Sequence, residues 1–88
     1  MTADFIIAEL QSVGTPAKAA HLQRFFKTGP GQYGEGDVFI GVVVPHTRSI
    51  AKANLGTPVS ELHRLLRSDY HEARLCALLI LTERFKKA

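Results

Sequence analysis

The tripeptide Gly-Thr-Pro occurs twice, at residues 14–16 and 56–58, and each copy is typical of the end of one helix and the start of the next. Glycine commonly ends a helix, threonine is a favoured N-cap, and proline fits the first helical turn, where its missing N–H costs nothing. The two copies lie 42 residues apart, within the ~40–47 residue period of HEAT-type helix pairs. The sequence therefore predicts an all-α chain built from helix pairs.

Apolar spacing predicts about five helices and their inward faces. The first helix follows a Thr2 cap and stops at Gly14, and the second follows a Thr15 cap. Thr57 and Pro58 start a later helix in the same way. The positions expected to face the core are Phe5, Ile6, Leu10 and Val13 in the first helix, Ala19, Leu22, Phe25 and Phe26 in the second, and Val59, Leu62, Leu65 and Leu66 in the later one.

The last helix is predicted to begin near Ser68 or Asp69 and to run to about Lys87, with Glu72 completing a capping box on Asp69. Its middle is apolar on all sides, which is typical of a helix packed between two layers. Two HEAT-type pairs are fewer than the roughly three that bury a continuous core, so the array is expected to be incomplete. The uncovered side of this helix is therefore expected to promote self-association through Leu78, Leu79 and Leu81.

Residues 38–44 are rich in β-branched side chains, as a buried strand would be. A single strand without a partner cannot satisfy its backbone hydrogen bonds, and no second strand candidate exists. The segment is therefore interpreted as an extended lead-in to a short helix from Pro45 to about Ala53. The preceding residues, 28–37, contain four glycines and one proline and predict an irregular loop.

Size and composition limit the functional classes. With 88 residues and 9.7 kDa, the chain is one domain or part of one. Its longest apolar run, 75–81, is far shorter than the ~20 residues that span a bilayer, so we expect no membrane segment. The single cysteine, Cys76, lies within that run, where burial would raise its pKa, and it fits a cytoplasmic location.

No complete catalytic or metal motif is present. Residues 29–34 match G-x-G-x-x-G, but the strand before it and the helix after it that a dinucleotide site needs are missing. His71 and Glu72 begin a zinc-protease pattern whose second histidine position is Leu75. We expect no catalytic residue, no metal and no cofactor in this chain.

Positive charge is concentrated in the second half, since residues 1–44 carry a net charge of −1 and residues 45–88 carry +4. Arg48 and Lys52 are four residues apart on the short helix and are predicted to point outward together, where they could bracket a phosphate. The alternative is an ordinary solvated helix face.

The segments GPGQYGEGDVFIGVVVPHTRSIAK (29–52) and SDYHEARLCALLILTERFKKA (68–88) resemble the N-terminal part of bacterial DNA alkylation repair proteins of the AlkD-like family. The resemblance covers essentially the whole chain. It implies an α-helical HEAT-like solenoid, with residues 1–88 forming its N-terminal portion. It also implies a concave basic surface that holds duplex DNA, in a glycosylase that releases purines alkylated at N3 or N7.

The resemblance implies that Arg48 and Lys52 bind DNA, as contacts to the phosphate backbone of the duplex, with weaker help from Arg74. It carries no catalytic role. The catalytic aspartate and tryptophans of the family lie in later repeats, and this sequence contains no tryptophan. Two functions therefore stay open: part of a glycosylase-type repair protein, or a non-catalytic helical-repeat module that binds DNA or a protein partner.

Overall fold

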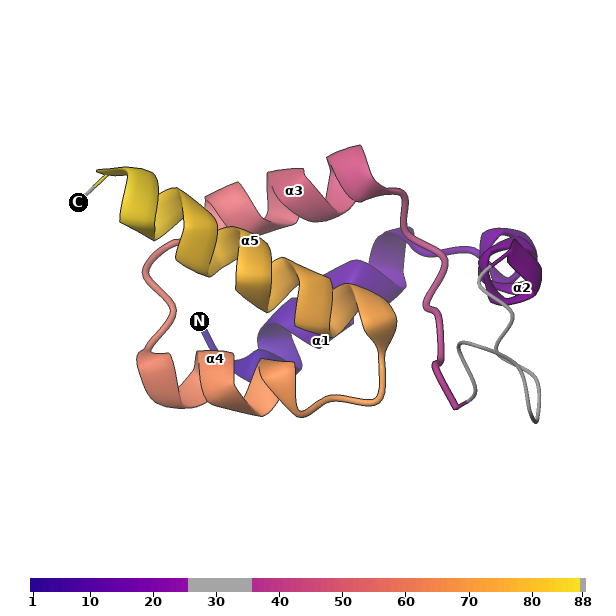
Figure 1. Ribbon diagram of the computed structural model, residues 1–88, viewed down its shortest axis with the longest axis horizontal. Coiled ribbons are helices and arrows are strands. Elements are labelled where there is room, and N and C mark those ends of the chain that lie inside the picture. Colours follow the sequence, from indigo (N-terminus) through magenta and orange to yellow (C-terminus); the bar gives the residue numbers. More distant parts are fainter. Residues whose placement is uncertain (26–35, 88) are drawn as a thin grey trace.

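The chain folds into five α-helices within residues 1–25 and 36–87, the part that the computed structural model describes (Figure 1). This part contains no β-strand, which confirms the all-α prediction. The predictions for Phe26, for most of the irregular loop and for the glycine pattern at 29–34 lie outside the described residues. The helices are α1 (Ala3–Val13), α2 (Pro16–Phe25), α3 (Val44–Ala53), α4 (Val59–Leu66) and α5 (His71–Lys87).

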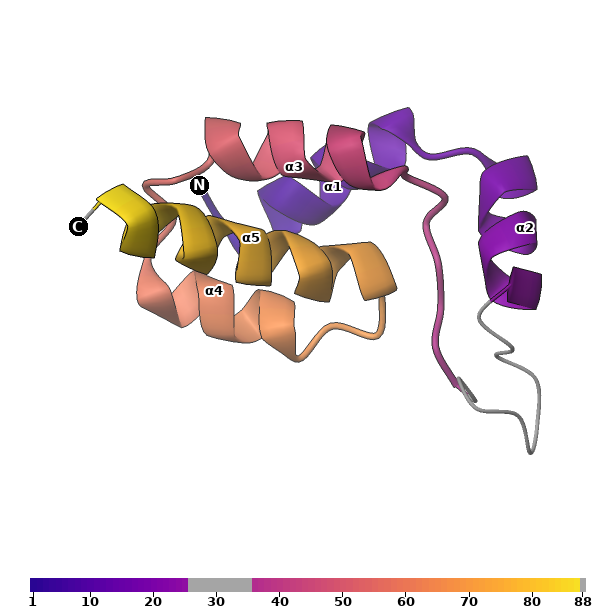
Figure 2. The same ribbon diagram turned by 45° about the horizontal axis from the view of Figure 1, so that its top comes forward.

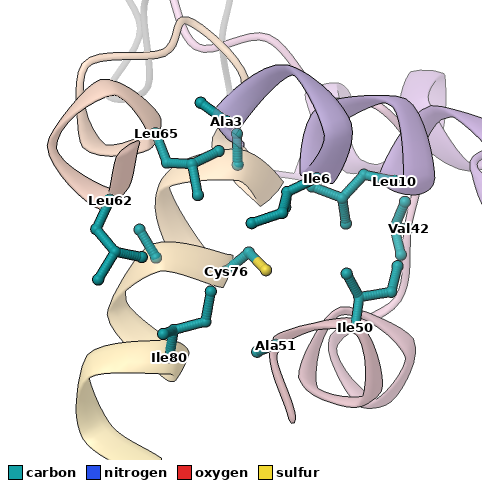
Figure 3. Packing of buried hydrophobic residues seen from close by; sticks show 12 residues of the cluster. Ala3, Ile6, Leu10, Val42, Ile50, Ala51, Leu62, Leu65, Cys76 and Ile80 are labelled. Atoms are coloured by element: carbon teal, nitrogen blue, oxygen red, sulfur yellow. The ribbon is translucent and has the colours of Figure 1, made fainter. Parts of the chain in front are cut away.

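Helix α5 lies between α3 and α4, and α1 crosses behind these three helices (Figures 1 and 2). This arrangement confirms that α5 is packed between neighbours on both sides. The core forms where the four helices meet, around the buried side chains of α5 (Figure 3). Its buried members are Ala3, Ile6, Leu10, Val42, Ile50, Ala51, Leu62, Leu65, Ala73, Cys76, Ala77 and Ile80.

Of the three predicted threonine caps, two are present and one is wrong. The Oγ1 atom of Thr2 accepts a hydrogen bond from Phe5 N at 3.1 Å, and Oγ1 of Thr15 accepts one from Lys18 N at 3.2 Å. Thr57 does not cap α4, because its hydroxyl is buried and donates to the carbonyl oxygen of Asn54 at 2.6 Å. The two Gly-Thr-Pro copies therefore have different local structures.

The start of α5 also differs from its prediction. The helix begins at His71, and Glu72 forms no capping box with Asp69, because its carboxylate binds the backbone of another segment. Three residues predicted to face the core, Phe5, Phe25 and Val59, are more than half exposed. Phe5 and Val59 each lie at the edge of an amphipathic stripe that is wider than the surface its helix buries, whereas Phe25 lies on α2, which buries no side chain.

Residues 38–43 form an extended strap that runs past the start of α5 into α3 (Figure 2). Its only ladder pairing within the described residues is a single parallel bridge between Val38 and Tyr70, with His71 N donating to Val38 O at 2.8 Å. The segment is thus the predicted lead-in to a helix that begins at Val44, one residue before Pro45.

Helix α2 lies apart from the other helices and has no buried side chain (Figure 2). It reaches the strap at Gly41, whose carbonyl accepts a hydrogen bond from Thr15 N at 3.3 Å. Gly41 has a φ of +97°, and a Cβ there would lie 2.2 Å from Thr15 O and 2.8 Å from Ala19 N. Only glycine permits this backbone approach without strain.

Candidate nucleic-acid interface

Arg48 and Lys52 lie on the outward side of α3, one helical turn apart, and both are exposed. The opposite side of the helix carries Ile50 and Ala51, which are buried in the core. Within the described residues, neither cation forms an ion pair. Side chains four residues apart on a helix are neighbours, so these two cations can contact one phosphate or two adjacent ones.

Side-chain hydrogen bonds lie at both ends of α3, and one of them joins the helix to α1. At the start, Thr47 Oγ1 donates to Val43 O at 3.2 Å. At the end, the buried Asn54 donates through Nδ2 to Ile50 O at 2.8 Å and to Glu9 Oε1 at 3.0 Å. The second of these bonds joins the end of α3 to α1, so the two basic side chains project from a helix held by its neighbours.

Most of the remaining cations of the second half already have partners. Arg64 lies 3.2 Å from Glu61 Oε1, Lys86 lies 3.8 Å from Glu83 Oε1, and Arg84 donates to Thr57 O at 2.8 Å. Arg67, the C-cap residue of α4, is exposed, and the other cation of α4, Arg64, is paired within the described residues. The pair on α3 is thus the one place in the described second half where two unpaired basic side chains share a helix face.

Arg74, the third predicted contact, is engaged within the protein. Its guanidinium forms an ion pair with Asp37 and donates to Ser68 O at 2.8 Å. His71 also binds Asp37, with 3.1 Å between Nδ1 and Oδ2. Burial alone would raise the pKa of Asp37, but the hydrogen bonds from Arg74 and His71 outweigh it and hold that pKa below its ordinary value. Arg74 therefore sits in an ion-pair cluster at the start of α5, separate from the pair on α3.

Sequence reasoning missed the role of Glu72. Its side chain is almost fully buried, and its carboxylate accepts hydrogen bonds from three consecutive backbone N–H groups of the strap. The donors are Ile40 N at 2.8 Å, Gly41 N at 2.9 Å and Val42 N at 3.0 Å. The carboxylate thus holds the strap against α5 and fixes where α3 begins. In the sequence, Glu72 is an acidic residue next to an apolar run. This pattern fits a helix-capping role as well as it fits the observed contact with the strap.

Cys76 is buried, and burial, with a smaller contribution from the charge of Glu9, raises its pKa to about 11. A thiol in this state is a poor nucleophile, as expected from the sequence. No group of three or more His, Cys, Asp or Glu side chains in residues 1–25 and 36–87 is arranged to hold a metal ion. None of the helices in the same residues is both long and apolar enough to cross a bilayer.

The geometry defines an all-α chain in which two exposed basic side chains share one face of α3. A sequence profile of the family described as DNA alkylation repair enzyme matches residues 6–88. The chain therefore belongs to the DNA alkylation repair enzyme family, which confirms the resemblance and supports a role in DNA repair. No curated protein and no solved structure gives a significant match.

Proposed function

We propose that residues 1–88 are the N-terminal portion of a HEAT-like DNA alkylation repair domain, related to glycosylases that excise N3- or N7-alkylated purines from duplex DNA. In this proposal the portion acts as a scaffold and binds the DNA backbone, and it performs no chemistry itself. The observation that carries the proposal is the unpaired Arg48 and Lys52 on one face of α3. Family membership supplies duplex DNA as the partner.

The chemistry of the two side chains suits a backbone contact. Arginine and lysine bind phosphate oxygens without reading the base sequence. Binding of this kind is driven by the release of counterions from DNA, and its Kd is typically no tighter than ~10⁻⁴ to 10⁻⁶ M at physiological salt. Arg74 is the weakest of the three proposed phosphate contacts, because its guanidinium would have to leave Asp37 to reach a phosphate.

Fluorescence anisotropy with a labelled duplex of mixed sequence tests the backbone contact. We expect Arg48→Ala/Lys52→Ala to weaken binding by roughly tenfold or more, since non-specific affinity is almost entirely electrostatic. The matched control is Arg64→Ala/Arg67→Ala, which removes the same charge from α4 and its C-cap, and α4 lies on the opposite side of α5 from α3 (Figure 1). If both double variants lose affinity equally, the net charge of the chain and not the α3 face determines binding.

A glycosylase assay tests the absence of chemistry. The chain has no tryptophan, and its aspartates do not match the catalytic position implied by the family resemblance. We therefore expect no release of N3-methyladenine or N7-methylguanine from alkylated duplex DNA above a heat-denatured control. Release above that control would show that the 88 residues carry an active site and would overturn the scaffold proposal. A chain that binds no DNA at all would favour the alternative, a module for a protein partner.

A further inference from the structure

An apolar pocket of about 330 Å³ lies where α2, the strap and the first turns of α5 meet. Most of its lining is aliphatic or aromatic, and its volume is at the lower end of the range of ligand pockets. In Figures 1 and 2 this end of the molecule, marked by α2, lies opposite to the C-terminus. The lining includes His21, Leu22, Phe25, Phe39, Val44 and Leu75.

Aromatic rings form part of the pocket lining. The buried Phe39 ring and the His71 ring are stacked, with 4.5 Å between their centroids and an interplanar angle of 28°. Asp37 restrains the orientation of His71 through the 3.1 Å contact between Oδ2 and Nδ1. Phe25 of α2 supplies a third ring and is 70% exposed. Nucleobases stack on aromatic side chains of this kind, and such stacking tolerates any base because every base has a π-face.

The pocket adjoins the basic face of α3. Val44 lines the pocket, and Val44, Arg48 and Lys52 follow one another at intervals of four residues, so the three form one exposed row along the helix. At 1.5 Å per residue, each step of this row is about 6 Å along the helix axis. A phosphate bound at Arg48 would therefore lie close enough to the pocket for the base of the same or the next nucleotide to enter it.

We propose that this pocket receives one unpaired nucleobase of the DNA whose backbone Arg48 and Lys52 hold, an inference that rests on the proposed function. The base meets rings and aliphatic side chains, and its phosphate meets the cations of α3. Glu72, the one acid among the described residues that line the pocket, is buried and accepts three hydrogen bonds from the strap, so it presents no exposed negative charge to the DNA.

This occupant also determines which DNA the chain prefers. Taking a base out of a duplex costs least where the base is mismatched, damaged or already unpaired. The pocket therefore favours DNA with a local defect over a fully paired duplex, whereas the two cations bind the backbone of both.

Fluorescence anisotropy with three duplexes of one sequence tests the proposal. One duplex is fully paired, one carries a single-adenine bulge, and one carries an abasic bulge at the same position, which keeps the altered backbone and lacks the base. We expect the adenine bulge to bind at least about fivefold tighter than the abasic bulge, because stacking of a base on an aromatic side chain contributes at this level. Phe25→Ala should remove most of this difference. The matched control is Phe5→Ala, which changes a phenylalanine of α1 that is 53% exposed and does not line the pocket, and it should leave the difference unchanged.

Equal affinity for the two bulged duplexes, or an adenine preference that Phe25→Ala leaves intact, overturns the proposal. Failure of the proposed function looks different, because Arg48→Ala/Lys52→Ala would then leave the affinity for the fully paired duplex unchanged. A chain that binds the paired duplex through these two cations and shows no adenine preference keeps its backbone contact and contradicts only the base pocket.

Tryptophan fluorescence locates the base, since the chain contains no tryptophan of its own. Phe25→Trp places one indole at the pocket, and a base stacked on an indole quenches its emission. We expect the adenine bulge to quench this emission more strongly than the abasic bulge does. Phe5→Trp is the control and should respond equally to both duplexes. An equal response of Phe25→Trp to the two duplexes would contradict stacking of a base in the pocket.

Discussion

Glu72 and Gly41 lie 31 residues apart in the sequence and are joined by a hydrogen bond of 2.9 Å from Gly41 N to Glu72 Oε2. The same oxygen accepts a bond from Val42 N, and Oε1 accepts one from Ile40 N. A carboxylate at one end of α5 thus replaces the neighbouring strand that the strap lacks. This contact fixes the segment that leads into α3, and with it the position of the basic helix face.

Glu72→Gln should destabilise the fold by about 2–3 kcal/mol, because an amide offers one acceptor oxygen where the carboxylate offers two, and a buried N–H of the strap loses its partner. Urea denaturation followed by circular dichroism measures the change. Glu83→Gln, which affects only a surface pair with Lys86, is the control and should cost less than about 0.5 kcal/mol. Equal stabilities of the two variants would show that the three backbone bonds contribute nothing.

Gly41→Ala should detach α2 from the strap. The added methyl group would lie 2.2 Å from Thr15 O, and the backbone at Gly41 has a positive φ. We therefore expect the free energy of unfolding to fall by about 2–4 kcal/mol. Hydrogen exchange of the amides in 16–25 should increase in this variant. Gly36→Ala separates strain from crowding, because Gly36 also has a positive φ of +84° but its added methyl would meet no atom within 4 Å. If hydrogen exchange in α2 increases equally in both variants, the close approach at Gly41 is not what holds α2 against the strap.

The ion pairs of Asp37 should make stability depend on pH in the acid range. The folded-state pKa of Asp37 lies below the ordinary 3.8, so the unfolded chain binds more protons in that interval and stability rises with pH. The contribution is complete above pH 3.8 and is lost as the pH falls through the folded-state pKa. Asp37→Asn should therefore cost roughly 1–2 kcal/mol at pH 7 and much less at about pH 2.

Asp69→Asn is the control for this measurement, since it removes an exposed carboxylate that forms no ion pair in the described residues. It should change the free energy of unfolding by less than about 0.5 kcal/mol. A loss for Asp37→Asn that is the same at pH 7 and at about pH 2 would contradict the ion-pair account.

The helices could be predicted from the sequence because their signals are local. The Thr2 and Thr15 caps and the alternation of Arg48 and Lys52 with Ile50 and Ala51 depend on residues within one or two turns. The role of Glu72 has no such signal. Its partners are backbone N–H groups about 30 residues away, which every residue except proline possesses.

The ion pair of Arg74 is likewise absent from the local sequence pattern. Its partner Asp37 lies 37 residues earlier in the sequence, beside a glycine-rich stretch that carries no helical pattern. A side chain's outward position can be predicted from periodicity, but its ion pairs depend on the tertiary fold. Of the three predicted contacts, Arg48 and Lys52 share α3, whereas Arg74 is paired with Asp37.

The salt dependence of DNA affinity tests most directly whether the outward face of α3 binds the phosphate backbone. If Arg48 and Lys52 each neutralise one phosphate, a plot of log Kobs against log salt concentration should have a slope about 1.8 more negative for the wild-type chain than for Arg48→Ala/Lys52→Ala, because each contact contributes about −0.9. Anisotropy titrations on one duplex at several salt concentrations give both slopes. Identical slopes for the wild-type chain and the double variant would contradict the account and show that these two charges only keep the α3 face solvated.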